Sequence, residues 1–177
     1  MSSSERPIRV LVAGRFQPVH SGHISLIEQA LELGDVVIVV GSAEKGRSWD
    51  DPFTCRERLE MLKAAIKEKG WDASRFTIIP VEDIHSNELW VAKVEMLTPE
   101  FHTVMTGNRL VEHLFREKGY TVVRPKAFRP EVCSGRYIRE KLRAEKSLSP
   151  LRSIVPPSVS RIINKPDVLR FISSQKR

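Results

Sequence analysis

A short apolar run that leads directly into a glycine turn and then into a helical pattern constrains this chain's fold more than any other feature. Residues 8–13 are almost continuously apolar, as in a strand buried on both faces of a parallel sheet. Gly14 allows a tight turn off that strand, and apolar residues then recur at helical spacing between residues 24 and 33. Free backbone N–H groups and the positive end of the helix dipole face the loop between them. The sequence therefore predicts an α/β fold with an anion-binding first loop.

Three side chains of this loop fit an anionic ligand. His20 and His23 are three residues apart at the first helical turn, and so lie on roughly one face of the helix. Arg15 adds a planar, permanently charged fork that suits phosphate. Two other interpretations are that the histidines only cap the helix or lie in the core, or that they share a metal ion. No nearby carboxylate or cysteine completes a ligand set, so we expect no metal bound by protein side chains.

Apolar runs and helical patterns alternate along the rest of the chain. Further strands are expected at residues 35–41, 76–81, 103–106 and 120–124, and helices at residues 23–33, 54–69, 90–97, 110–117, 136–146, 159–164 and 167–173. This order indicates a Rossmann-like, doubly wound parallel sheet that ends in short C-terminal helices. In such sheets, ligands bind at the carboxyl ends of the strands.

Composition limits the class of protein. Apolar residues make up 41% of the 177 residues, which is enough for one domain with a core of its own. No run approaches the ~20 apolar residues of a membrane span, and residues 1–7 lack the apolar stretch of a secretory signal. Cys55 and Cys133 form no C-x-x-C pair, which fits free thiols in a reducing compartment. We therefore expect a cytoplasmic protein.

Positive charge is concentrated in the later half of the chain. Residues 109–152 hold twelve Lys and Arg against five Asp and Glu, whereas residues 1–90 hold eleven against fourteen. A polyphosphate substrate or a nucleic acid could bind such a region. RNP, helix-turn-helix and zinc signatures are absent from the sequence, which argues against a nucleic-acid-binding module.

Two later segments add candidate binding groups. Ser134 and Gly135 open a helix whose first turns carry Arg139, so a hydroxyl, backbone N–H groups and a guanidinium can surround a phosphate. Asp83, Asn87 and Trp90 follow the strand expected at residues 76–81. An indole can stack on a flat heterocycle, and an amide can pair with a carboxamide. The other interpretation of the indole is that it is simply part of the core.

These segments together resemble one family. Residues 14–23, Gly-Arg-Phe-Gln-Pro-Val-His-Ser-Gly-His, resemble the H-x-G-H signature of the nucleotidylyltransferase superfamily, in the fuller form of the archaeal-type nicotinamide mononucleotide adenylyltransferases. Residues 134–139 resemble its second signature, S-G-x-x-[IV]-R, and residues 51–58 resemble its D-P-F-T-x-x-E-R segment. On this resemblance we assign residues 1–7 to a loose or disordered N-terminus, 8–160 to the nucleotidylyltransferase domain and 161–177 to a C-terminal helical extension.

The resemblance implies transfer of the adenylyl group of ATP to nicotinamide mononucleotide, which gives NAD and pyrophosphate in one step of NAD biosynthesis. Mg²⁺ would bridge the phosphates, and the enzyme would be a homo-oligomer, a hexamer by resemblance. The residues that it implies for catalysis are His20, His23, Arg15, Ser134 and Arg139. Those that it implies for ATP are Gly14, Phe16, Gln17, Gly22, Gly107, Asn108 and Gly135. Those that it implies for the mononucleotide are Asp83, Asn87, Trp90 and Arg47.

One position departs from the family pattern. The family often has a basic residue just before D-P-F-T that reaches the mononucleotide phosphate, but this chain has Asp50 there. Arg47 or Lys45 is expected to serve instead. The alternative functions are a nucleotidylyltransferase with a nicotinate mononucleotide, FMN or pantetheine phosphate acceptor, the basic nucleic-acid-binding module, or an interaction protein that kept the fold without catalysis.

Overall fold

A parallel sheet forms the centre of the molecule. The computed structural model describes residues 8–175, and within them lies a five-stranded sheet in the order β3-β2-β1-β4-β5, with every neighbouring pair parallel. The strands are β1 (Arg9–Gly14), β2 (Asp35–Val40), β3 (Phe76–Pro80), β4 (Thr103–Met105) and β5 (Thr121–Val123). The predicted Rossmann-like α/β fold is confirmed. The N-terminal segment 1–7 that we expected to be loose lies outside the described residues.

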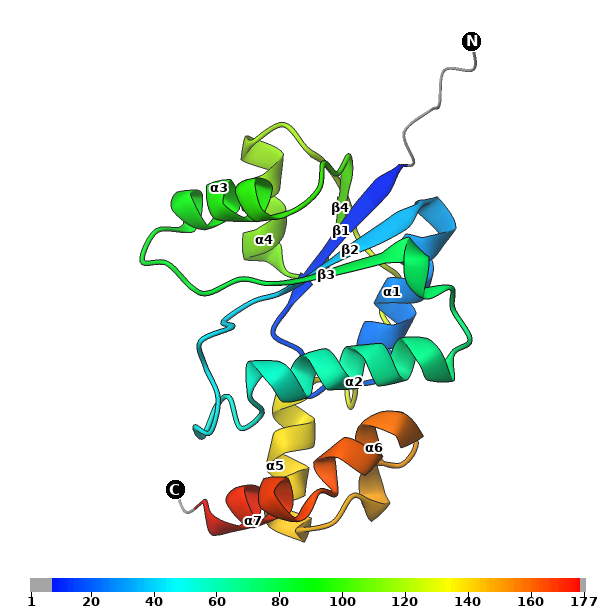
Figure 1. Cartoon of the computed structure of the whole chain (residues 1–177), viewed down its shortest axis with the longest axis vertical. Coiled ribbons are helices and arrows are strands. Elements are labelled where there is room, and N and C mark those ends of the chain that lie inside the picture. The colour runs from blue at the N-terminus through cyan, green and yellow to red at the C-terminus, as the bar shows by residue number, and fades with distance from the viewer. Residues whose placement is uncertain (1–7, 176–177) are drawn as a thin grey trace.

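Helices cover both faces of this sheet. In Figure 1, α3 and α4 lie on one side of it and α1 and α2 on the other, with α5, α6 and α7 beyond α2. The α-helices are α1 (Ser21–Leu33), α2 (Cys55–Glu68), α3 (Asn87–Leu97), α4 (Arg109–Glu117), α5 (Gly135–Glu145), α6 (Pro157–Ile163) and α7 (Pro166–Ser174). Single 3₁₀ turns span Ala73–Arg75 and Ser149–Leu151. None of the helices among residues 8–175 combines the length and the apolar character needed to cross a membrane.

Side chains along the central strands point alternately to the two faces of the sheet. Val10 and Val12 of β1 pack toward α1 and α2, whereas Leu11 packs toward α3 and α4. Because successive strand residues point to opposite faces, a continuous apolar run serves two cores at once. Full burial of each such side chain contributes roughly 1.5–3 kcal/mol. This explains why residues 8–13 could be recognised as a strand buried on both sides.

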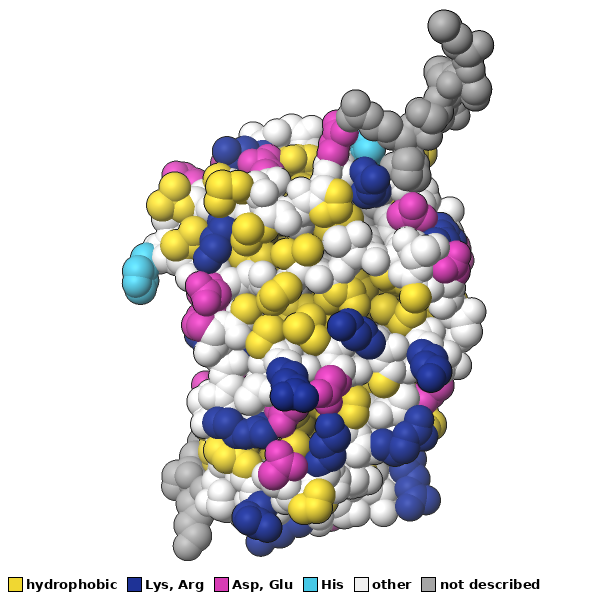
Figure 2. Space-filling view, in the orientation of Figure 1, with side chains coloured by type: hydrophobic (Ala, Val, Ile, Leu, Met, Phe, Trp, Pro, Cys, Tyr) yellow, Lys and Arg dark blue, Asp and Glu magenta, His cyan; other side chains and the backbone are white. Residues whose placement is uncertain are grey.

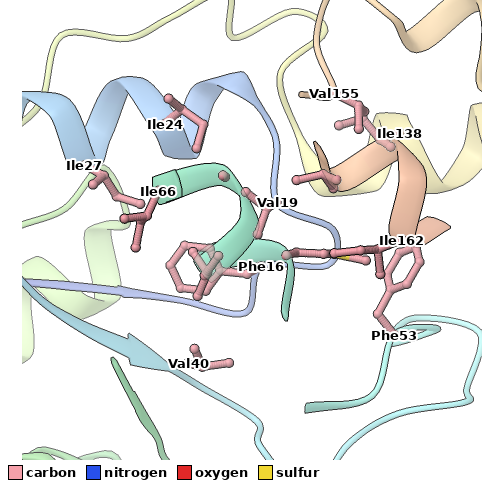
Figure 3. Close-up of a cluster of buried hydrophobic side chains, with 14 of the residues drawn as sticks. Phe16, Val19, Ile24, Ile27, Val40, Phe53, Ile66, Ile138, Val155 and Ile162 are labelled. Carbon is pink, nitrogen blue, oxygen red and sulfur yellow. The ribbon is translucent and has the colours of Figure 1, made fainter. Parts of the chain in front are cut away.

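The larger core joins segments that are far apart in the sequence. Figure 3 shows Phe16 and Val19 of the loop after β1 close to Ile138 of α5, to Ile162 of α6 and to Val155, which precedes α6. The C-terminal helices therefore pack on the same core as the first loop. Our expected boundary between residues 160 and 161 falls inside α6, and the division into a domain and an extension stays a prediction.

Six of the helices begin one to three residues earlier than the sequence pattern indicated, and α3 differs the most. Helix α1 begins at Ser21 with His20 at its N-cap, and α3 begins at Asn87 because the Ser86 hydroxyl accepts a hydrogen bond from the Leu89 N–H (3.4 Å). The helix expected at residues 90–97 therefore begins three residues earlier than predicted, at Asn87. A Ser N-cap satisfies one of the free N–H groups of a helix and so fixes its start. Apolar spacing alone did not reveal that cap.

Candidate active site

The two histidines of the first loop contact each other directly. His20 is the N-cap of α1, and its backbone N–H donates to Nδ1 of His23 (3.3 Å). The two imidazole rings stack with centroids 3.7 Å apart, and the Phe16 ring lies 4.6 Å from that of His23. Because Nδ1 of His23 accepts a hydrogen bond, a neutral ring carries its proton on Nε2. His23 is thereby prepared as a hydrogen-bond donor.

Burial keeps both rings neutral at pH 7. Desolvation lowers the pKa of His20 to about 4. Desolvation, with a smaller contribution from His20, holds the pKa of His23 well below its usual value. Nδ1 of His20 is buried and has no hydrogen-bond partner among the described residues. An unpaired buried lone pair is tolerated better than an unpaired N–H, so His20 also carries its proton on Nε2.

The second predicted motif meets the first at Arg139. Arg139 is buried on α5, and its Nη1 donates to the backbone carbonyl of Gln17 (2.8 Å), 122 residues earlier. Desolvation lowers the pKa of this guanidinium, and the nearby cations Arg15 and Arg143 lower it further. A Cβ at Gly135 would lie 2.9 Å from both Nη1 of Arg139 and the Gln17 carbonyl. Only glycine leaves room for this contact.

A pocket of about 180 Å³ lies where the motifs meet. Its walls include one imidazole and three guanidinium groups; the lining residues are Arg15, Phe16, Gln17, His23, Gly135, Arg136 and Arg139. The structure thus brings together around one small cavity four predicted residues of the first motif, Arg15, Phe16, Gln17 and His23, and two predicted residues of α5, Gly135 and Arg139. The stacked ring of His20 lies directly behind His23. A cavity lined by cations and a neutral imidazole donor suits a phosphate group.

Other predicted residues of the two motifs have packing or capping contacts. The side-chain amide of Gln17 donates to the Phe53 carbonyl (2.7 Å) and accepts from the Phe53 N–H (2.9 Å). Phe16 is buried in the larger core. The Ser134 hydroxyl caps α5 by accepting from the Tyr137 N–H (3.2 Å). These side chains hold the walls of the pocket in place, and their contacts with ATP remain predictions.

Two glycines of the first loop lie where a side chain would collide. A Cβ at Gly22 would lie 3.0 Å from two atoms of the His20 ring, and one at Gly14 would lie 3.3 Å from the Phe16 ring. Both glycines therefore allow aromatic rings to approach the backbone closely. This explains their presence without any contact to a ligand.

A fully buried arginine connects the loops around the pocket. Arg58 of α2 donates through Nη1 to the carbonyls of Arg15 (2.9 Å) and Gly41 (2.8 Å). Its Nη2 donates to the carbonyls of Ser42 (2.9 Å) and Lys45 (3.1 Å). Burial lowers the pKa of this guanidinium. One side chain thus fixes the loop after β1 to the loop after β2.

Arg58 lies in the segment that resembles D-P-F-T-x-x-E-R, but the sequence predicted no role for it. The helix expected at residues 54–69 is confirmed as α2. The Thr54 hydroxyl accepts from the Glu57 N–H (3.3 Å) and the Glu57 carboxylate accepts from the Thr54 N–H (2.9 Å), the reciprocal pattern of a capping box. An arginine on the apolar face of α2 was the signal that could have revealed the buried role.

The two residues expected to replace the missing basic residue are already paired. Arg47 donates to both oxygens of the Glu57 carboxylate (2.8 and 2.5 Å), and this hydrogen bonding raises its pKa. Lys45 donates to the Asp83 carboxylate (2.6 Å), which raises the lysine's pKa. In the part of the chain that the structure describes, Arg47 does not line the pocket of His23 and Arg139. Its contact with the mononucleotide stays a prediction.

The predicted acceptor residues lie beyond β3. Asp83 accepts hydrogen bonds from the Ser42 hydroxyl (2.9 Å) and from Lys45. Burial alone would raise the pKa of Asp83, but these hydrogen bonds outweigh it and lower the pKa. Asn87 is exposed on the first turn of α3, and Trp90 is half-buried with its ring edge-on to Phe115 (centroids 6.2 Å apart). These side chains share one end of the sheet but form no buried cluster.

The segment after β4 also forms a helix cap. The Asn108 side chain accepts from the Leu110 N–H (2.9 Å) and the Val111 N–H (3.3 Å), and so caps α4. A Cβ at Gly107 would meet no atom within 4 Å. Both residues lie at the carboxyl end of a strand that neighbours β1. That edge is where the fold binds ligands, and their contact with ATP stays a prediction.

No dedicated metal cage is built from side chains in residues 8–175. No group of three or more His, Cys, Asp or Glu residues close enough to hold an ion is found there. Cys55 and Cys133 are both free thiols. The donor set of the pocket is cationic or neutral. A divalent cation would therefore need phosphate oxygens as its ligands.

Comparisons with known proteins agree with this arrangement. A family model described as cytidylyltransferase-like matches residues 11–141. The nicotinamide-nucleotide adenylyltransferase of Pyrococcus abyssi is 43% identical over 159 residues, which cover 89% of this chain and 83% of the relative. That of Picrophilus torridus is 41% identical over 90% of this chain and 92% of the relative. The chain therefore belongs to the cytidylyltransferase-like family and, within it, to the archaeal-type nicotinamide-nucleotide adenylyltransferases.

Solved structures share the fold at low sequence identity. A bifunctional NMN adenylyltransferase/ADP ribose pyrophosphatase of Francisella tularensis, complexed with AMP and a Mn ion, superposes with a TM-score of 0.71 at 17% identity. The similarity covers 95% of this chain and 52% of that one, so this chain spans about half its length. A putative nicotinate-nucleotide adenylyltransferase of Vibrio parahaemolyticus superposes with a TM-score of 0.65 at 17% identity, over 93% of this chain and 96% of that one.

Proposed function

We propose that this protein transfers the adenylyl group of ATP to nicotinamide mononucleotide and so produces NAD and pyrophosphate. The observation that carries the proposal is the hydrogen bond between Arg139 and the Gln17 carbonyl (2.8 Å). It joins the two signature segments around one pocket with His23 and Arg15 in its wall. A pocket built from both segments is what binding a single polyphosphate requires.

The chemistry needs placement and charge stabilisation, without a general base. The attacking atom is a phosphate oxygen of the mononucleotide, which is already ionised at neutral pH. It attacks the α-phosphorus of ATP in line with the departing pyrophosphate, without a covalent intermediate. Positioning and electrostatic stabilisation supply most of the rate in such transfers. The neutral His23 fits this role because it lines the pocket and can offer an N–H to phosphate oxygens without needing to exchange a proton.

Arg139 and Arg15 have different tasks in this mechanism. Arg139, fixed on the Gln17 carbonyl, stabilises negative charge that develops on the phosphates. Arg15 is half exposed, at 51% of its side chain, and pairs with Asp51 (3.2 Å), so it can turn toward a bound phosphate. Mg²⁺ bound to the phosphates of ATP would neutralise part of their charge. The fit is to an ion carried by the substrate, because the pocket offers no carboxylate.

The acceptor is assigned to the open end beyond β3. Asp83 and Asn87 would hold the amide and ribose of the mononucleotide, and Trp90 would stack on its pyridine ring. The exposure of Asn87 and the half-burial of Trp90 support this, since both have surface free for a ligand. In the basic segment 109–152, ion pairs such as Arg116 with Glu112 and Arg136 with Glu140 involve four of the twelve Lys and Arg residues.

The proposal extends to assembly and location. We expect a homo-oligomer, a hexamer as in the family, that acts in the cytoplasm. Light scattering after size-exclusion chromatography measures the mass of the assembly directly. A particle of one 20.2 kDa chain would contradict the oligomer.

The function is tested by offering ATP with one acceptor at a time and following pyrophosphate release. The acceptors are nicotinamide mononucleotide, nicotinate mononucleotide, FMN and pantetheine phosphate. We expect the highest kcat/KM with nicotinamide mononucleotide. Higher values with another acceptor would replace the assignment within the same chemistry, and no release with any of them would overturn it.

A further inference from the structure

A second pocket lies beside the pocket of His23 and Arg139. It has a volume of about 460 Å³ and shares Arg15, Arg136 and Arg139 with the smaller one. Its remaining lining residues are Trp49, Asp50, Glu140 and Arg143. The shared arginines make the two pockets one groove that runs from His23 to Trp49. Trp49, Glu140 and Arg143 of this groove are residues to which the family resemblance assigns no role.

Arg143 is held in this groove by the loop after β2. Its Nη2 donates to the Trp49 carbonyl, and its guanidinium carbon lies 4.0 Å from the centroid of the Trp49 ring. Its Nε donates to the side chain of Gln175 (3.3 Å). A guanidinium stacked on an aromatic ring keeps donors free at its edge and has already lost most of its rotamer freedom. Such a side chain binds an anion at little further entropic cost.

The charges around the groove favour an anion. Glu140 pairs with Arg136 (2.9 Å) and Asp51 pairs with Arg15 (3.2 Å). Within residues 8–175, neither Arg139 nor Arg143 has a carboxylate oxygen within ion-pair distance. Burial lowers the pKa of Arg143, while Asp50 and Glu140 oppose that change. Two arginines one helical turn apart on α5 are thus left without a direct counter-ion.

The loop after β2, which lies beside Arg139 and Arg143, carries a negative charge at Asp50 where the family pattern has a positive one. Asp50 occupies the position before D-P-F-T where the family often has a basic residue, and both Arg47 and Lys45 are engaged with carboxylates elsewhere. Arg143 reaches the same loop from α5 and ends on Trp49, the residue next to Asp50. On the face shown in Figure 2, Lys and Arg side chains likewise gather over α2 and the C-terminal helices.

We propose that Arg143, positioned by Trp49, supplies from helix α5 the phosphate-binding charge that the loop lacks at Asp50. Its ligand is a phosphate group of a substrate that lies in the groove between Arg143 and Arg139. That phosphate belongs either to the terminal end of ATP or to the mononucleotide. The proposal rests on the proposed function for the identity of the substrates, but the anion site itself is defined by the groove.

The central test neutralises Arg143 and then moves the charge back to the loop. Arg143→Gln is expected to raise the KM of one substrate at least tenfold, with kcat changed less and with the KM of the other substrate within twofold. The substrate whose KM rises identifies the phosphate. Adding Asp50→Arg to this variant is expected to recover most of the loss. Arg170→Gln, an exposed arginine on α7 outside both pockets, is the matched control and should match the wild type.

Binding of inorganic tripolyphosphate, followed by calorimetry, tests the anion site without turnover. Arg143→Gln should weaken it about tenfold and Arg143→Lys less, while Arg170→Gln leaves it unchanged. Arg143→Lys replaces Arg143→Gln in every comparison if the latter does not fold. Wild-type tripolyphosphate affinity together with unchanged KM values in the Arg143 variant would overturn the proposal. If the wild type shows no turnover, the proposed function fails, and tripolyphosphate binding alone decides on this site.

Discussion

The loop after β1 and the loop after β3 both lie at the carboxyl ends of parallel strands, but they are fixed to different degrees. Around the first, Gln17 bonds the backbone of Phe53, Arg139 bonds the Gln17 carbonyl, and Arg58 bonds carbonyls of the loops after β1 and β2. After β3, the hydrogen bonds of Asp83 with Ser42 and Lys45 are close to the surface. The phosphate side is therefore preorganised, whereas the acceptor side is open. This division suits an enzyme whose rate comes from placing phosphates and whose specificity comes from the acceptor loop.

The largest effect is expected from removing Arg58, the arginine that hydrogen-bonds to both loops of the phosphate side. Arg58→Met keeps the length and apolar stem of the side chain but leaves four carbonyls, buried or partly buried, without this donor. We expect a loss of more than about 3 kcal/mol in the free energy of unfolding, because each unsatisfied buried group costs about 1–3 kcal/mol. Urea denaturation measures it.

The neighbouring arginine provides the control for that experiment. Arg56 is 89% exposed and pairs only across one turn with Glu60 (3.2 Å). Arg56→Met should change stability by less than about 0.5 kcal/mol, as exposed ion pairs contribute little. Equal effects of the two substitutions would show that the buried arginine does not hold the loops.

A smaller effect is expected from a substitution that displaces Arg139 without altering any charge. In Gly135→Ala, the new Cβ would meet Nη1 of Arg139 and the Gln17 carbonyl at 2.9 Å, so the guanidinium must move. We expect kcat/KM to fall on the order of 10²-fold, comparable to losing one preorganised donor. Steady-state pyrophosphate release measures it. In Gly41→Ala the nearest atom would be the Gly14 carbonyl oxygen at 3.8 Å, so activity should stay near wild type, and a similar loss there would refute the steric explanation.

Neutral, buried histidines give the phosphate side a dependence on pH. The pKa of His20 is about 4 in the folded protein against about 6.5 when exposed. Between these values the unfolded chain binds a proton that the folded chain does not, so stability falls as the pH is lowered from 6.5. The slope is about 1.4 kcal/mol per pH unit for one such group, with His23 acting in the same direction.

Urea denaturation at pH 7.0 and pH 5.0 measures this slope. The double variant His20→Gln, His23→Gln should show a clearly shallower dependence than the wild type. His113→Gln, a change at an exposed histidine of α4, serves as the control and should keep the wild-type slope. An unchanged slope in the double variant would mean that other groups control stability in this range.

The two regions also differ in how far they could be predicted from the sequence. Residues 8–13 and Gly14 revealed the strand, the turn and the parallel sheet, because burial on both faces leaves an unbroken apolar run. The motif histidines and Arg139 were found since their spacing carries the chemistry. Arg58 was missed because its partners are carbonyls, which leave no pattern in the sequence. The link between Arg143 and Trp49 joins residues 94 positions apart and could only be seen in the fold.

The smallest effect is expected from a substitution on the acceptor side, at Asn87. Asn87 is exposed on the first turn of α3, so Asn87→Ala removes an amide without disturbing the core. We expect the KM for nicotinamide mononucleotide to rise about fivefold to tenfold, since a single hydrogen bond contributes roughly 1 kcal/mol. The KM for ATP and the melting temperature should not change. Glu88→Ala, the adjacent exposed position, is the control. If Asn87→Ala instead raises the KM for ATP or lowers the melting temperature, the acceptor does not bind beside α3, and the open end of the sheet has a structural role.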